Sequence, residues 1–274
     1  LDHPLDQPTA FRPEDLVAAV RLERGRGMAP VPAVCVLEFD GDLTDKLLER
    51  GELARCEQWP CFHTTMWRWK SAGLDCGIVA RTIGGPYTVL VAEQLAVCGA
   101  KLIVGLASAG RLTPTLPLPA LVLADEAIRD EGTSYHYLPP AETVEATPEP
   151  LVWLEASLRE VGLPFRKGLV WTTDAPYRET REQVQRHAGR GALAVEMQAA
   201  SLFAFGRQRH VPVALVAHVT NAIDHTGEQF GKGPDDIDVR LLQAICQGAH
   251  RWLTIVDRAG AMAAEEQICP NTRL

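Results

Sequence analysis

The segment Gly191–Phe203 places a carboxylate and an amide at the start of an otherwise apolar helix pattern. These two groups belong to Glu196 and Gln198, with Met197 between them. Burying a charged side chain costs several kcal/mol unless a partner compensates for the lost water. The pair therefore belongs either to a structural hydrogen-bond network or to a binding site for a polar ligand, and this segment alone does not decide between them.

Four segments upstream also combine glycines or polar side chains with apolar runs. They are Thr82-Ile83-Gly84-Gly85-Pro86, Ser108-Ala109-Gly110, the run from Arg129 to Tyr137 and the run from Trp171 to Thr180. In this order, and followed by Glu196-Met197-Gln198, the segments resemble the nucleoside phosphorylase family, which contains uridine phosphorylase, purine nucleoside phosphorylase and the methylthioadenosine nucleosidases. The resemblance extends over residues 31–225, and it is more specific for the fold than for the reaction.

The resemblance implies a single α/β domain of three layers, in which a twisted, partly barrel-like mixed sheet is flanked by helices. It implies that this catalytic domain spans residues 31–274, after an N-terminal arm of residues 1–30. It also implies active sites completed by a neighbouring subunit, in a homodimer or a trimer of dimers. The implied activity is cleavage of the N-glycosidic bond of a small nucleoside-like substrate. Such a site must hold the ribose, stabilise the leaving base and present a nucleophile below C1′.

The ribose site is the first place where this chain departs from the family. There, a Glu-Met-Glu segment at the position of Glu196-Met197-Gln198 holds the ribose, and its second acid accepts hydrogen bonds from the vicinal hydroxyls. Here that acid is Gln198, whose amide oxygen makes a bond about half as strong as that of a carboxylate. Three explanations stay open: the sugar is bound more weakly, the ligand is not an ordinary riboside, or an engineered substitution silences turnover.

The positions that bind phosphate in uridine phosphorylase-like members differ as well. Gly105 and Asp45 stand where the family has two arginines. An anion site that loses two bidentate arginines should bind phosphate poorly. The loop Ser108-Ala109-Gly110 resembles the nucleosidase branch, which uses water, so phosphorolysis and hydrolysis both stay open. Arg111 is a candidate substitute, and Asp42, in the remnant of the anion loop, is a predicted catalytic residue.

The base site is the third difference. Asn221 stands where purine-specific members and nucleosidases have an aspartate that protonates the base, and an amide can only hydrogen-bond it. Thr180 and Glu182 stand where uridine phosphorylases have the glutamine and arginine that bind uracil. The pyrimidine signature is therefore missing too, although Asn221 keeps a predicted role in catalysis.

The segment around Thr180 has two interpretations. In the first, Asp174, Arg178 and Glu179 build a different base site, in which Asp174 is catalytic and Arg178 and Thr180 bind substrate. In the second, these residues supply a helix N-cap and exposed helix charges.

Two further segments are predicted to complete the site. His63 lies in the aromatic-rich stretch Cys61–Trp69, close to where the family sends a residue into the neighbouring subunit's site; a packed, hydrogen-bonded histidine is the alternative. Aromatic residues, Met and Arg, as in this stretch, are enriched at interface cores. Asp224 and His225 begin a polar segment, 226–233, that resembles the family's flap over the base, with a mobile loop as the alternative.

The composition of the whole chain limits its partners. A net charge of −8 over 274 residues argues against non-specific binding to nucleic acid or to an anionic membrane surface. The sequence has no apolar stretch of membrane-spanning length and no signal-peptide pattern, so a cytoplasmic location is expected. The seven cysteines show no CxxC pair and no zinc spacing, so no metal and no cofactor are expected; Cys35 is predicted to be a buried, reduced thiol.

The elements that must position these residues follow from apolar periodicity. Strands are predicted at 34–39, 76–82, 102–106, 121–124, 168–173, 192–196 and 211–219, and helices at 13–22, 43–50, 86–98, 151–161, 179–188, 198–208 and 236–257. Residues 139–150, rich in proline and glutamate, resemble a linker. Buried strands that alternate with helices indicate a mostly parallel sheet covered on both faces.

Three functions are consistent with these residues. The first is an enzyme that cleaves the N-glycosidic bond of a nucleoside or nucleoside-like metabolite, by phosphorolysis or hydrolysis. The second is a repurposed member of the family whose pocket acts on a non-nucleoside ligand. The third is a non-catalytic binding protein. The remnant of the ribose site and the flap favour the first.

Overall fold

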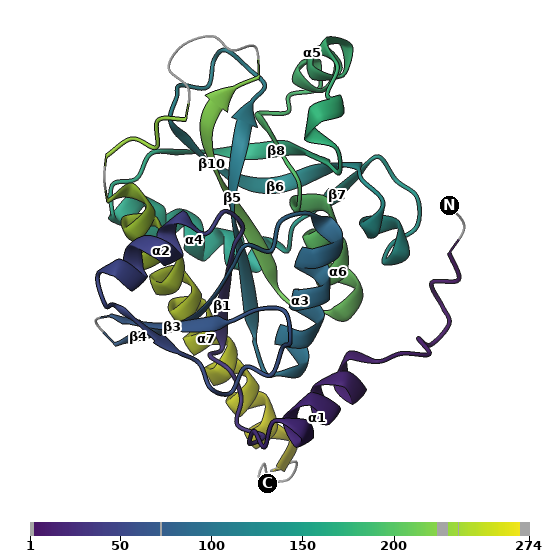
Figure 1. The fold of residues 1–274 in the computed structure, drawn as a ribbon, viewed down its shortest axis with the longest axis vertical. Helices are drawn as coiled ribbons and strands as arrows, with labels where there is room; N and C mark the ends of the chain where they lie inside the picture. Colours follow the sequence, from purple (N-terminus) through teal and green to yellow (C-terminus); the bar gives the residue numbers. More distant parts are fainter. Residues whose placement is uncertain (1–2, 72, 224–229, 235, 269–274) are drawn as a thin grey trace, which may run out of the picture.

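One mixed sheet runs through the chain, and helices pack on both sides of it (Figure 1). The computed structural model describes residues 3–71, 73–223, 230–234 and 236–268. The strands are β1 (Val34–Glu38), β2 (Leu53–Arg55), β3 (Met66–Ser71), β4 (Leu74–Ala80), β5 (Leu102–Arg111), β6 (Ala120–Asp130), β7 (Thr143–Glu145), β8 (Phe165–Thr173), β9 (Ala194–Glu196) and β10 (Val213–Ala222). The helices are α1 (Pro13–Glu23), α2 (Asp42–Glu49), α3 (Gly85–Val97), α4 (Pro148–Glu160), α5 (Arg181–Gly189), α6 (Ala199–Arg209) and α7 (Ile237–Ile268), with 3₁₀ turns η1 (Thr133–His136) and η2 (Pro176–Arg178).

The sheet is partly closed into a barrel. Its strand order is β10-β6-β8-β9-β5-β1-β4-β3-β2, and β7 pairs with β6. Because β10 also pairs with β5, the strands β5, β9, β8, β6 and β10 form a closed ring, from which β1, β4, β3 and β2 extend as an open sheet. The predicted fold, a twisted and partly barrel-like mixed sheet flanked by helices, is confirmed.

The centre of the sheet determines where a ligand can bind. Strand β1 lies between β4 and β5, parallel to both, and all of its residues are buried. Strands covered on both faces are apolar throughout, which explains the run Val34–Leu37. Helices α3 and α6 pack together on one side, and α4 and α7 pack together on the other (Figure 1). The carboxyl ends of the parallel strands β1, β5 and β10 therefore meet at one edge, where ligands bind in open α/β sheets.

Three strands continue beyond the apolar runs that predicted them. Strand β5 extends to Arg111, β6 to Asp130 and β10 to Ala222, whereas the predictions end at 106, 124 and 219. The added residues are partly polar, but ladder hydrogen bonds of the barrel hold them in the sheet. The predicted linker 139–150 is wrong, because it contains β7, which pairs with β6, and the start of α4.

The antiparallel edge of the sheet is a second difference. The sequence does not predict β2 and β3, which pair with each other and, through β3, with β4. Met66 and Trp69 of β3 are buried, as is Cys61 before it. Several large apolar groups of the aromatic-rich stretch are thus packed inside the chain itself, and they need no partner to cover them.

The two terminal helices pack on this body. In the N-terminal arm, α1 lies against α3 and buries Val17 and Val20. Helix α7 begins where it is predicted but continues to Ile268 rather than ending at 257. No helix among the described residues is both long and apolar enough to cross a membrane.

The cysteines behave differently from one another. Cys35 is a buried free thiol, as predicted, and burial raises the pKa of its thiol far above the usual range. Cys76 of β4 and Cys246 of α7 form a disulfide, with their Cα atoms 6.6 Å apart. This link between the sheet and the last helix is not predicted by the spacing of the cysteines.

Candidate active site

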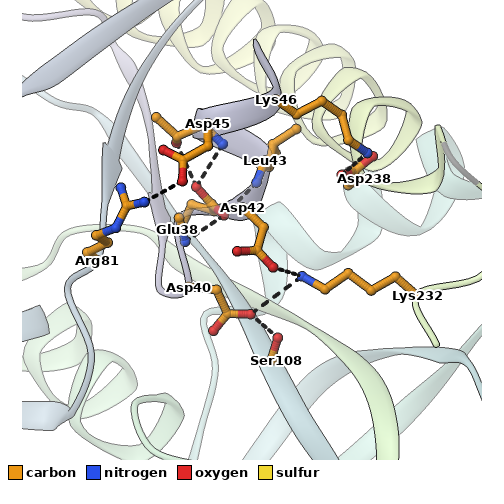
Figure 2. Close-up of polar contacts among 12 residues, drawn as sticks. Glu38, Asp40, Asp42, Leu43, Asp45, Lys46, Arg81, Ser108, Lys232 and Asp238 are labelled. Carbon is orange, nitrogen blue, oxygen red and sulfur yellow. Dashed lines mark hydrogen bonds and ion pairs between the residues drawn. The ribbon is translucent and has the colours of Figure 1, made fainter. Parts of the chain in front are cut away.

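A polar cluster lies where β1, β5 and β10 end. Glu38, the last residue of β1, stands opposite Leu106 of β5, and Ser108 of β5 stands opposite His218 of β10. Figure 2 shows the side chains of this edge, with Glu38, Asp40 and Asp42 converging from β1 and the start of α2. The predicted residues Ser108 and Asp42 are therefore brought into one site.

Glu38 occupies the N-terminus of α2. Its Oε1 accepts hydrogen bonds from the backbone N–H groups of Gly41 at 2.9 Å and Leu43 at 3.0 Å. Its Oε2 accepts from the N–H of Thr44 at 3.1 Å and from the Thr44 hydroxyl at 2.6 Å. The backbone N–H groups at a helix N-terminus are ordinarily free to bind an external anion. Here an internal carboxylate, only 3% exposed, already fills that position.

The environment of Glu38 opposes its charge. Burial raises the pKa of Glu38, and the hydrogen bonds from Thr44, Leu43 and Gly41 offset this only in part. Gly41 has a φ of 100°, and a Cβ there would lie 2.7 Å from the Arg81 side chain. Only glycine suits this turn, so the sequence at Gly41 helps to aim the N–H groups at Glu38.

Asp40 and Asp42 lie beside Glu38 and share one cation. Lys232 Nζ pairs with the Asp42 carboxylate and lies 4.0 Å from Asp40 Oδ2, while the Ser108 hydroxyl donates to the same Asp40 oxygen (Figure 2). Burial alone would lower the pKa of Lys232, but its contacts with Asp42, Asp40 and Glu38 raise it overall. A carboxylate pair of this kind, partly neutralised by a lysine, can bind water and accept its proton.

A small cavity opens into this cluster. Its volume is about 30 Å³, and Asp40, Ser108, His218 and Lys232 are among the residues that line it. Burial, followed by the Lys232 charge, lowers the pKa of His218, which favours the neutral ring. The cavity is polar, and it has the volume of about one water molecule.

The two positions where the family has arginines are filled differently here. A Cβ at Gly105 would lie 3.1 Å from the side chains of both Leu215 and Phe39, so the sheet leaves no room there for an arginine. Asp45 forms an ion pair with Arg81, which lies just after β4 (Figure 2). The region that corresponds to the family's phosphate site thus contains one arginine, Arg81, and four acids, at positions 38, 40, 42 and 45.

The segment Glu196-Met197-Gln198 connects β9 to α6. Glu196 accepts hydrogen bonds from the Thr172 hydroxyl at 2.6 Å and from the N–H groups of Gln198 at 2.6 Å and Ala199 at 2.8 Å. Burial raises the pKa of Glu196 to about 7, although these bonds lower it. The carboxylate of Glu196 therefore caps the start of α6, which favours the structural interpretation of this residue. Gln198 is also buried, and its role in ribose binding stays a prediction.

The sheet register places the other predicted substrate residues next to this segment. Gly110 of β5 stands opposite Val195 of β9 and, on its other side, opposite Asn221 of β10. Ala109, one residue earlier, is buried, whereas Met197 and Asn221 are partly exposed. Strand residues Ser108–Gly110, Asn221 and the segment around Met197 thus lie next to one another in the sheet.

The structure places Asp174, Arg178 and Thr180 in other environments. The Asp174 carboxylate accepts the N–H of Gly132 at 2.9 Å and lines a groove of about 620 Å³ that also contains Phe11 and residues of α3. Arg178 is exposed in η2. Thr180 is the N-cap of α5 and forms a capping box with Gln183. The capping interpretation therefore holds for Thr180, and the roles of Asp174 and Arg178 in the reaction stay predictions.

His63 is exposed at the surface near the start of α3. Its carbonyl accepts a hydrogen bond from the Tyr87 hydroxyl at 3.3 Å, and its ring lies edge-on to Phe62. The packed alternative does not describe this side chain, because it is open to solvent. Its role in a neighbouring subunit stays a prediction. Asp224, His225 and residues 226–229 of the predicted flap lie outside the described residues.

Sequence reasoning missed Glu38, Asp40 and Lys232. A signal for the first two is present: acids at every second position after a buried strand, around a glycine, are unusual for a loop that only connects two elements. Lys232 belongs to the predicted flap, but nothing in the sequence indicates that its ammonium group contacts Asp42. The two groups come together only in the folded chain.

Comparison with known proteins places this chain in a family. The sequence matches the profile of the Phosphorylase superfamily over residues 32–247. The chain therefore belongs to the phosphorylase superfamily, as its motifs indicate.

Several members are similar to it. A guanosine phosphorylase of Halorubrum lacusprofundi is 28% identical over 168 residues, which are 60% of this chain and 68% of the relative. A uridine phosphorylase of Thermococcus kodakarensis is 31% identical over 112 residues, 39% of each chain. The first three curated relatives are matched over 59%, 68% and 39% of their own length. The crystal structure of a purine nucleoside phosphorylase from Toxoplasma gondii, in complex with immucillin-H, has the same fold, with a TM-score of 0.69, 18% identity and coverage of 81% of this chain and 92% of that one.

Proposed function

We propose that the protein cleaves the N-glycosidic bond of a nucleoside or nucleoside-like metabolite and that water, not phosphate, is the acceptor. Membership of the phosphorylase superfamily supports the bond that is cleaved. The proximity of Ser108–Gly110, Asn221 and the segment around Met197 in the sheet supports the place where the nucleoside binds.

The single observation that carries the choice of acceptor is the position of Glu38. Its carboxylate takes the N–H groups of Gly41, Leu43 and Thr44 at the start of α2. A phosphate at this helix terminus would have to displace a buried carboxylate and then lie beside Asp40 and Asp42. The negative charges of Asp40 and Asp42 would repel the phosphate. Water has no charge and is not excluded in this way.

The chemistry then needs a base beside the reacting carbon. Asp40, Ser108 and Lys232 line the polar cavity, and Asp42 lies beside it, paired with Lys232. In the proposed reaction the water oxygen bonds to C1′ while the C1′–N bond breaks, and its electron pair leaves with the base. One of the two carboxylates accepts the proton of the water, and Lys232 balances the negative charge of the pair. Asp42, the predicted catalytic residue, is the more exposed of the two and is assigned the proton transfer.

A panel of purine and pyrimidine nucleosides, each incubated with and without millimolar phosphate, tests this function. The expected products are free base and ribose, at a rate that phosphate does not change. A rate that saturates with phosphate, with ribose 1-phosphate as product, would show that the acceptor is wrong while the bond is right. Binding of nucleosides without any turnover would instead favour a non-catalytic binding protein, and no binding at all would favour a repurposed pocket.

The proposal includes a homo-oligomer in which a second copy completes the site. His63 and Phe62 are exposed near the start of α3, where a neighbouring chain would cover them. Sedimentation at several protein concentrations, with activity measured on the same samples, separates a monomeric active form from an obligate dimer or a trimer of dimers.

A further inference from the structure

A cavity lies between the barrel and helix α5, and nothing in the reaction described so far uses it. Its volume is about 610 Å³. Leu112, Val184 and Ile223 form its apolar wall and belong to one apolar cluster. The remaining lining residues are Arg111, Pro114, Glu179, Arg181 and Gln185. A cavity of a few hundred Å³ that combines an apolar wall with polar groups is typical of a site for a small ligand.

The cavity adjoins the β5 residues of the candidate active site. The Ile223 side chain lies 3.0 Å from the position that a Cβ on Gly110 would take. Gly110 itself stands opposite Asn221, and Arg111, in the cavity wall, is the next residue of β5. A ligand whose sugar lies along Ser108–Gly110 therefore reaches this cavity with the group attached to C1′.

Glu179 is the acid of this cavity. It is half-buried, and among the described residues its carboxyl group has no hydrogen-bond or ion-pair partner. The neighbouring helix does not need it, because Thr180 and Gln183 already cap α5. A partly buried carboxyl that serves no structural contact is a candidate for a chemical role.

The protonation state of Glu179 suits an acid. Burial raises the pKa of Glu179 to about 7. The charged groups that line the cavity with it are Arg111 of β5 and Arg181 of α5, and neither offsets the effect of burial. The group is therefore partly protonated near neutral pH, the range in which general acid catalysis is most efficient.

The leaving base needs a proton donor, and Asn221 does not supply one. An amide can donate a hydrogen bond to the departing base, but it cannot transfer a proton. The sequence already predicts a base site in the segment that contains Glu179, and the α5 cavity is the space beside it. With the nucleobase there, we infer that Glu179 is the general acid that protonates the base as it leaves. This inference rests on the proposed function, and it limits the substrate to nucleosides whose base has a ring nitrogen that accepts a proton.

The step balances without any further reactant. As the C1′–N bond breaks, its electron pair moves into the base, and a ring nitrogen takes the proton of the Glu179 carboxyl group. Water adds to C1′ and gives its proton to Asp42. Glu179 then recovers a proton from solvent and Asp42 loses one, so that both return to their starting states.

The test compares two leaving groups. Wild type, Glu179→Gln and the matched control Glu182→Gln are assayed on purine nucleosides and on p-nitrophenyl riboside, whose phenolate leaves without protonation. Glu182 is an exposed acid in the first turn of α5, three residues after Glu179, and it does not line the cavity. We expect Glu179→Gln to lower kcat on the purine nucleoside by about 10²–10⁴-fold and to leave the p-nitrophenyl substrate within about threefold. The control variant should match wild type on both.

The pH profile of the wild type gives a second readout that needs no variant. On the purine nucleoside, kcat should fall above a pH of about 7, and this fall should be absent with p-nitrophenyl riboside. If wild type cleaves both substrates and Glu179→Gln behaves like the control, the role of Glu179 is overturned while the proposed function stands. If wild type cleaves neither substrate, the proposed function fails and this inference fails with it.

Discussion

Removing the Glu38 carboxylate should destabilise the protein and at the same time create a site for a small anion. Glu38→Ala leaves the N–H groups of Gly41, Leu43 and Thr44, and the Thr44 hydroxyl, without their acceptor. All four donors lie at a buried position, so water replaces the lost carboxylate only incompletely.

The size of the effect follows from these contacts. Leaving one buried donor unsatisfied costs about 1–3 kcal/mol, but the carboxylate itself is costly to bury, as its raised pKa indicates. The net loss in the free energy of unfolding should therefore be about 3–5 kcal/mol, the range measured when one partner of a buried charged network is removed. In a chain of this length that corresponds to a fall in Tm of roughly 10 °C. Thr44→Val removes a single hydroxyl contact and should cost only about 1 kcal/mol.

Thermal unfolding in formate, phosphate and chloride at equal ionic strength provides the assay. Formate and phosphate should raise the Tm of Glu38→Ala, because an anion that binds only the folded state adds about 2.7 kcal/mol at 100 times its Kd. Neither should raise the Tm of wild type or of Thr44→Val, in which the carboxylate still fills the site. Two results would refute the argument that Glu38 excludes phosphate. One is a loss in the free energy of unfolding of Glu38→Ala below about 1 kcal/mol, and the other is a rise in Tm with phosphate that is as large for wild type as for Glu38→Ala.

Three other changes test other parts of the site. Gln198→Glu should lower KM for ribosides by about tenfold, because a charge-assisted bond adds on the order of 1.4 kcal/mol; unchanged KM values across a nucleoside panel would contradict a ribose contact. Burial raises the pKa of Glu196 from 4.5 to about 7, so the folded state binds this proton more tightly than the unfolded state does. The free energy of unfolding should therefore fall by on the order of 3 kcal/mol as the pH rises through that window. Urea unfolding of Glu196→Gln should show a flatter pH dependence than that of wild type. His63→Ala should lower kcat/KM while changing the free energy of unfolding by less than about 0.5 kcal/mol. Trp67→Ala should instead weaken the dimer, as measured by sedimentation. Equal kcat/KM for His63→Ala and wild type would exclude a role of His63 in a shared site.

The sequence predicts the fold well because buried parallel strands leave a clear pattern. Val34–Leu37 is apolar on both faces, and only a strand covered on both sides needs that. The ends of strands are harder to predict: Ser108 and Asn221 look like loop residues, yet barrel closure between β5 and β10 keeps them in the sheet. That closure depends on pairing between strands more than a hundred residues apart, which no local window can detect.

The candidate site was predictable only where a family motif marks it. Ser108–Gly110 and Asn221 are each predicted to belong to the site, and the register places Gly110 opposite Asn221. Thr180, by contrast, aligns with a base-binding residue of the family but acts as a helix cap. Position in a motif indicates where a residue lies, and its contacts decide what it does.

Glu38 and Glu196 illustrate the same physical solution at two helix starts. Each is a buried carboxylate at the end of a strand that accepts the first N–H groups of the following helix, Glu38 for α2 and Glu196 for α6. Burial raises the pKa of both carboxyl groups. At α6 the arrangement leaves Met197, a predicted ribose contact, partly exposed, but at α2 it occupies the N–H groups on which an external anion would depend. In the proposed function, the same capping arrangement therefore decides the choice of acceptor at α2 and has no such consequence at α6.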